Sequence, residues 1–147
     1  MRVPPGTDCW RMTGTNECVN NAPFYFLEVE GDFEVRCKVK ANYESPDDQA
    51  GVMIREDEEN WIKCGIQMVG DIPHMCATVT HDYSDMSLHP LPVSVQVFVI
   101  LFCVCHHLVY TFYFLKNLDT TDFDAPSALQ SSRPINIYIY IYIYRAL

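Results

Sequence analysis

The chain has 147 residues, of which 49% are hydrophobic, and its formal net charge is −9. This length suits one domain and is too short for two of ordinary size. The acidic balance argues against a nucleic-acid partner, because binding to phosphates needs clustered lysine and arginine.

The charge is unevenly distributed along the chain. Residues 1–92 hold 16 acidic and 7 basic side chains, whereas residues 93–147 hold three of each. The whole acidic character therefore belongs to the first part, and the composition predicts a division near residue 92.

The cysteines favour a reducing compartment. No CxxC pair occurs and no apolar leader follows the first methionine, so we expect free thiols, no zinc site, no cofactor and a cytoplasmic location. A free cysteine packs like a small hydrophobic residue. The seven cysteines are Cys9, Cys18, Cys37, Cys64, Cys76, Cys103 and Cys105.

Regular structure is expected from Phe24 onward, after a first segment rich in proline, glycine and asparagine. A strand is predicted from Phe24, with a break at Gly31–Asp32 and a second strand after it. In the second strand, apolar and charged residues alternate strictly from Phe33 to Ala41, which is typical of a half-buried antiparallel strand.

Three more strands are expected between residues 49 and 88. AGVMIR, NWIKCGIQMV and MCATVTHDYS are separated by the charged turn REDEEN and by the turn GDIPH. In the second of these strands, Trp61, Lys63 and Gln67 share one face. Short alternating strands with turns about every ten residues predict an all-β antiparallel sandwich.

Three motifs in this region resemble the regulation of enolase protein 1 family, also called DUF1349. They are DQAGVMIR, NWIKCGI and VTHDYSD, and the upstream FYFLEVEGDFEVRCKVK fits the same pattern. The resemblance covers about residues 5–92. It implies a jelly-roll sandwich of the concanavalin A-like lectin/glucanase superfamily and a cytosolic role around carbohydrate metabolism. Two positions depart from the family pattern, namely Gln67 in place of glutamate and Met86 in place of tryptophan.

The tail after Pro92 has a different character. Residues 93–115 carry no formal charge and are long enough to span a bilayer, although Gln96, His106 and His107 interrupt them. Near the end, isoleucine and tyrosine alternate perfectly from Ile137 to Tyr144. A translated AT dinucleotide repeat has this sequence.

Two origins of the tail are considered. We interpret residues 93–147 as an unrelated segment, read from non-coding sequence, that follows the truncated N-terminal part of a sandwich at residues 1–92. A genuine membrane anchor through residues 93–115 is the alternative. A sandwich that has lost strands leaves open sheet edges. A further alternative is therefore that the chain is a mispredicted fragment without a stable fold or function.

Candidate ligand-binding residues lie around the second and third motifs. A carboxylate beside an aromatic ring on a sheet face suits sugars, because carboxylates accept hydroxyl hydrogen bonds and rings pack on apolar sugar faces. The candidates are Arg55, Trp61, Lys63, His81, Asp82, Tyr83 and Asp85.

Each candidate also has a purely structural reading. Asp82–Asp85 is a natural turn in which carboxylates bind nearby backbone N–H groups. Trp61 suits core or cross-strand packing, and Arg55 suits an ion pair with an acid of the following turn or with Asp47–Asp48.

Catalysis has little support in the sequence. A glycosidase needs two carboxylates about 5–10 Å apart across a cleft, but the four acids from Glu56 to Glu59 read as a solvated turn. We therefore predict a non-catalytic protein. The family resemblance implies a binding or regulatory role linked to carbohydrate metabolism, with a carbohydrate or a metabolic enzyme as the partner. A lectin-like carbohydrate-binding module and a glycan hydrolase remnant are the alternatives.

Overall fold

Every element of the fold is a β-strand in the parts of the chain that the computed structural model describes, which are residues 3–29, 32–39, 41–92, 99–106, 109–116 and 137–144. The strands are β1 (Cys9–Arg11), β2 (Cys18–Asn20), β3 (Phe24–Val29), β4 (Phe33–Val39), β5 (Gln49–Arg55), β6 (Asn60–Val69), β7 (Ile72–His81), β8 (Tyr83–Pro90), β9 (Val99–His106), β10 (Val109–Lys116) and β11 (Ile137–Tyr144).

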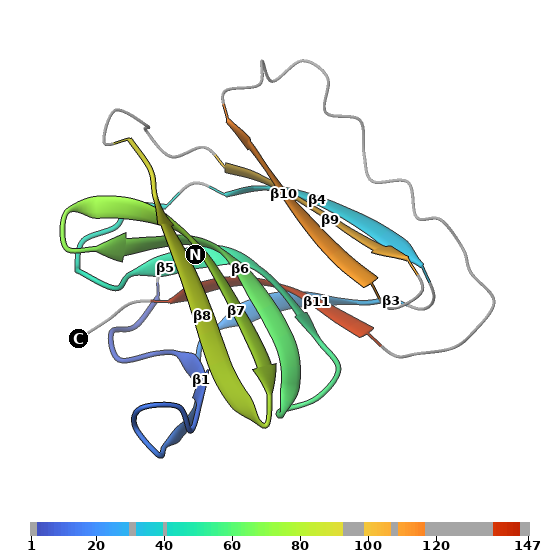
Figure 1. Ribbon diagram of the computed structural model, residues 1–147, viewed down its shortest axis with the longest axis horizontal. Helices are drawn as coiled ribbons and strands as arrows, with labels where there is room; N and C mark the ends of the chain where they lie inside the picture. Colours follow the sequence, from blue (N-terminus) through green and yellow to red (C-terminus); the bar gives the residue numbers. More distant parts are fainter. Residues whose placement is uncertain are drawn as a thin grey trace.

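The strands form three antiparallel sheets. Six strands follow the order β3-β11-β5-β6-β7-β8, three follow β10-β9-β4, and β1 pairs with β2. The three-stranded sheet lies over one face of the six-stranded sheet, and β1 lies on its other side (Figure 1). The all-β antiparallel architecture confirms the predicted fold class.

The main core fills the space between the two larger sheets. Alternation along β5 and β6 sends every second side chain into this layer, where it meets Phe33 and Val39 of β4. The cluster consists of Phe33, Val39, Ala50, Val52, Ile54, Cys64 and Ile66.

A second, smaller cluster lies on the opposite face of the six-stranded sheet. Cys9 and Ala22 from the N-terminal segment pack there against Met53 and Trp61. Every residue of β5 is consequently buried. This explains why β5 reads as a continuous apolar run, since a strand covered on both faces has no solvent side.

Two turns are tighter than the sequence indicates. The predicted turn at GDIPH reduces to Gly70 and Asp71, because β7 already begins at Ile72 and Pro73 pairs with Met68. Gly70 has a φ of 58°, which glycine adopts without steric cost. The predicted turn at Asp82–Asp85 reduces to Asp82, with a φ of 60°, and Tyr83 to Asp85 belong to β8.

Parts of the predicted tail form strands in both of the larger sheets. β9 pairs with β4, and β11 lies between β3 and β5. Residues 93–98, 107–108, 117–136 and 145–147, together with Gly31 of the predicted break, lie outside the described residues. Within the described part, no helix is long and apolar enough to cross a membrane. The separate origin of residues 93–147 stays a prediction.

We expect the genomic sequence to decide that origin. A splice donor at the Pro92 codon, followed in frame by an AT repeat, is the result that our interpretation predicts. Sequencing of genomic DNA and of transcripts across this codon provides the measurement. Transcripts that run uninterrupted from Pro92 to Leu147 would show that the tail is genuine protein.

The facing glycines Gly51 and Gly65 give a second prediction. A Cβ on Gly51 would lie 2.1 Å from the backbone oxygen of Cys64, so the two strands approach too closely for any side chain there. We expect Gly51→Ala to lower the free energy of unfolding by about 2–4 kcal/mol in urea titrations.

The matched control is Gly70→Ala. Nothing lies within 4 Å of a Cβ there, so only the left-handed backbone resists the change, at about 1–2 kcal/mol. Equal losses for Gly51→Ala and Gly70→Ala would show that the close approach of β5 and β6 has no special role.

Candidate functional site

The polar side chains of the six-stranded sheet gather on the face opposite the main core, which we call the covered face. Cross-strand register places Gln49, Lys63, Thr78 and Ser84 on it, in four neighbouring strands from β5 to β8. Residues 3–22, which we call the N-terminal cover, lie against this face through the contacts described below.

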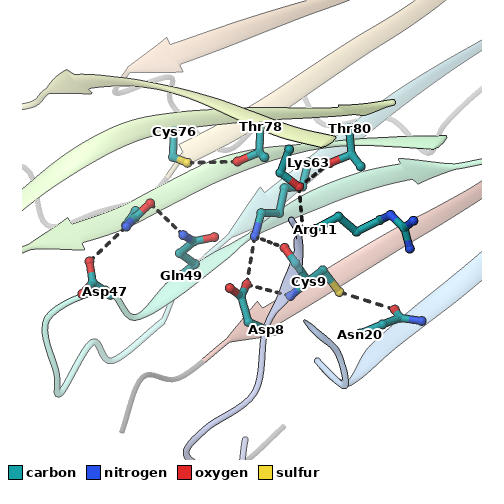
Figure 2. Close-up of polar contacts among 12 residues, drawn as sticks. Asp8, Cys9, Arg11, Asn20, Asp47, Gln49, Lys63, Cys76, Thr78 and Thr80 are labelled. Atoms are coloured by element: carbon teal, nitrogen blue, oxygen red, sulfur yellow. Dashed lines mark hydrogen bonds and ion pairs between the residues drawn. The ribbon is translucent and has the colours of Figure 1, made fainter. Parts of the chain in front are cut away.

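Lys63 is the central group of the covered face. Its side chain is 2% exposed, and its Nζ lies 3.0 Å from Oδ1 of Asp8 and donates to the backbone oxygen of Cys9 at 2.8 Å (Figure 2). The ammonium also lies 5.7 Å from the ring centroid of Trp61. A buried charge needs such partners, because removal from water disfavours the ionised form.

Further contacts fix the cover along the sheet. The backbone N–H of Arg11 donates to Oγ of Ser84 at 2.9 Å, and this hydroxyl also bonds Thr80 at 2.7 Å. Nη1 of Arg55 donates to the side chain of Asn20 at 2.8 Å. The cover is therefore held at both of its strands, β1 and β2.

Three predicted ligand residues are buried beneath this cover. Trp61 is 5% exposed and belongs to the cluster with Cys9 and Met53. Arg55 donates from Nε to the backbone oxygen of Asp57, so it contacts the following turn through a carbonyl group. Trp61, Lys63 and Arg55 are thus brought together in the structure, where they hold the N-terminal cover.

The other predicted residues lie apart, at the β7–β8 hairpin. His81 pairs with Tyr83 across the hairpin and both side chains are exposed. Nδ1 of His81 lies 2.6 Å from Oδ1 of Asn60, and Asp82 donates its backbone N–H to Glu59. Register places His81 and Tyr83 on the face opposite Trp61. The candidates therefore form two groups, and we call His81, Asp82, Tyr83 and Asp85 the tip surface.

Acidic residues near both ends of the sheet serve as local caps. Oδ1 of Asp57 accepts hydrogen bonds from the backbone of Glu59 and Asn60 at 2.7 Å. Hydrogen bonds from the Asn60 side chain, then from these backbone groups, lower the pKa of the Asp57 carboxyl. Oδ2 of Asp48 likewise accepts from the backbone of Glu44 and Ser45.

Burial also changes the chemistry of two cysteines. Desolvation raises the pKa of the Cys9 thiol, and the nearby Lys63 ammonium opposes this only in part. Desolvation likewise raises the pKa of the Cys76 thiol, and a hydrogen bond with Thr78 opposes this only in part. Among the described residues, no group of three histidine, cysteine or acidic side chains is placed to hold a metal ion.

The sequence did not reveal several residues of this site. Asp8 lies outside every motif named above, and it is 55 positions from its partner Lys63. Gln49 and Ser84 lie inside two of the motifs, DQAGVMIR and VTHDYSD, but nothing in those motifs marked them as polar groups of a buried face. The only available signal was Lys63 itself, since its place beside Trp61 on a buried strand demands an acid from elsewhere in the chain.

Comparisons with known proteins identify the family to which the sequence is similar. The sequence model described as Protein of unknown function (DUF1349) matches residues 1–137, a longer stretch than residues 5–92. Regulation of enolase protein 1 of Saccharomyces cerevisiae is 33% identical over 81 residues, which make up 55% of this chain and 41% of that protein. An uncharacterized protein of Emericella nidulans is 31% identical over 98 residues, or 63% of this chain and 48% of that one.

A solved structure supports the fold. A functionally unknown protein from Saccharomyces cerevisiae superposes with a TM-score of 0.76 at 22% identity, over 95% of this chain and 73% of that chain. The matched part is less than half of each curated relative.

The ion pair between Asp8 and Lys63 gives a testable expectation. Asp8→Ala should lower the free energy of unfolding by about 2–3 kcal/mol, because it leaves the buried ammonium without its carboxylate. The double variant Asp8→Ala/Lys63→Met should regain most of this loss in chemical denaturation. Glu59→Ala is the control, since it breaks the exposed pair with Arg11 and should cost below about 1 kcal/mol. Equal losses for Asp8→Ala and Glu59→Ala would contradict the assignment.

The cysteines should differ in reactivity. Iodoacetamide should label exposed Cys18 first at pH 7.5, because burial and a raised pKa keep Cys9 and Cys76 as hindered thiols. The slower labelling of Cys9 and Cys76 should persist as the pH rises toward 9 and should vanish in denaturant. Peptide mass spectrometry over time measures it, and labelling of Cys76 as fast as Cys18 would contradict the buried environment.

Proposed function

Because the chain belongs to the DUF1349 family, whose description assigns no function, we propose that it is a non-catalytic binding protein with a regulatory role near carbohydrate metabolism. The tip surface is its binding surface. The relative named Regulation of enolase protein 1 suggests the class of partner, a metabolic enzyme.

One observation carries the proposal. The charged groups of the covered face already hold the protein together, whereas the tip surface is exposed and makes few internal contacts. Tyr83 is 62% exposed, and Asp82 and Asp85 beside it are exposed as well. Exposed tyrosine is enriched in binding surfaces because its ring offers a large contact area at a low cost in entropy.

The roles of the acids support a non-catalytic protein. A glycosidase requires two carboxylates that face each other across a cleft. Here the carboxylate of Asp8 pairs with Lys63, and those of Asp48 and Asp57 cap turns. The free thiols Cys9, Cys64 and Cys76 support a cytosolic location for this role.

Carbohydrate is the second candidate ligand. The joint exposure of Tyr83, Asp82 and Asp85 at the β7–β8 hairpin is a specific observation in its favour. A ring packs on the apolar face of a sugar, while carboxylates accept its hydroxyl hydrogen bonds.

The proposal predicts a separation between binding and stability. Tyr83→Ala should weaken binding to purified yeast enolase, or to any sugar found on a glycan array, by about tenfold or more. Its free energy of unfolding should change by less than about 0.5 kcal/mol, because the side chain is exposed. Biolayer interferometry and urea titration measure the two quantities.

Ile72→Ala is the matched control, since Ile72 is 44% exposed at the opposite end of the sheet. It should leave binding unchanged. Absence of binding to enolase and to every sugar tested would refute the proposal, and so would equal losses for the two variants.

A further inference from the structure

Three side chains at one end of the covered face form a chain of hydrogen bonds with a fixed direction. Nε2 of Gln67 donates to Oδ1 of Asp47 at 3.1 Å, and Nε2 of Gln49 donates to Oε1 of Gln67 at 2.7 Å. An ionised carboxylate can only accept, so Gln67 must turn its amide nitrogen toward Asp47. Its oxygen then requires the nitrogen of Gln49, which leaves Oε1 of Gln49 as the final acceptor.

That final acceptor has no donor. Oε1 of Gln49 is buried and lacks a hydrogen-bond partner among the described residues, and the whole residue is 4% exposed. Buried polar atoms are ordinarily paired, so an orphan acceptor marks a position where a donor is expected from outside. Reversing the Gln49 amide would not help, because two oxygens would then face each other across the pair with Gln67.

A cation lies further along the same face. Lys63 and Gln49 project from the same side of the sheet (Figure 2), and the facing pair Gly51–Gly65 separates their positions in the register. The ammonium of Lys63 is occupied by the carboxylate of Asp8 and the carbonyl oxygen of Cys9. Both groups belong to the N-terminal cover, which is joined to the sheet by side-chain contacts and is not one of its six strands.

We propose that the covered face is a binding site for a small hydroxy acid and that the N-terminal cover is its inhibitory lid. The ligand carboxylate takes the place of the Asp8 carboxylate at Lys63, and the ligand hydroxyl donates to Oε1 of Gln49. No bond is made or broken, since this is binding only. The site is distinct from the tip surface, so the experiment below tests it independently of the function proposed above.

The two anchoring groups define the ligand class. Lys63 selects an anion, and the orphan oxygen of Gln49 selects a donor, which a plain carboxylate lacks. Sites built to hydrogen-bond a hydroxyl discriminate strongly against analogues without it, because the protein group is then left unpaired. A small carboxylic acid that also carries a hydroxyl has both groups.

The experiment compares L-malate with succinate, which lacks only the hydroxyl. Isothermal titration calorimetry on the full chain should show malate binding at least tenfold more tightly. Asp8→Asn should strengthen malate binding about tenfold, because it removes the competing carboxylate. Gln49→Leu should abolish the preference for malate over succinate, and Gln49→Met serves as the second variant where the leucine variant does not fold.

Two controls make the outcome decisive. Tyr83→Ala alters an exposed side chain on the opposite face of the sheet, away from the cover, and should leave malate affinity within twofold of the original protein. Near-ultraviolet circular dichroism verifies folding of each variant. Equal affinity for malate and succinate, or no binding of either by folded Asp8→Asn, would overturn the proposal. A structural water molecule would then be the donor to Oε1 of Gln49.

Discussion

The ion pair between Lys63 and Asp8 is the constraint on which one side of this molecule depends. A lysine in the middle of a strand covered on both faces loses its contact with water, and a nearby carboxylate and carbonyl acceptor offset the cost of that loss. This pairing brings residues far away in the sequence onto the sheet, and it positions Cys9 against Trp61 and Arg11 against Ser84. The N-terminal segment is therefore part of the domain, although it contributes only two short strands.

The central strands consequently separate two environments with different chemistry. Toward the three-stranded sheet, β5 and β6 present an apolar cluster that includes Val52 and Ile66. Toward the N-terminal cover they present amides, a lysine, an arginine and two glycines beside the apolar side chains of Met53 and Trp61. A polar group in such a layer costs free energy when it lacks a partner, so the layer specifies one placement of the cover more sharply than apolar packing would.

The strands and the faces of their side chains could largely be predicted from the sequence, because both depend on the pattern of neighbouring residues. The period of two along β6 correctly placed Trp61 and Lys63 on one face, because alternation is a property of the strand itself. The sequence could not show that His81 and Tyr83 lie on the opposite face, because that depends on a hairpin that turns at Asp82 alone. Asp8 was equally hidden, since long-range partners leave no periodic signal.

Isoleucine and tyrosine alternate over all eight residues of β11, and this repeat weakens the specification of its pairing register with β3. Ile137 lies opposite Val29 and Ile139 opposite Leu27, and a slide of two positions would again bring isoleucine opposite each of them. The strand repeat and the sheet pleat share a period of two, so such slides preserve every inside-outside relation. Only the strand ends can then distinguish one alignment from the next. Insertion or deletion of whole Ile-Tyr units would lengthen or shorten this strand without inverting it.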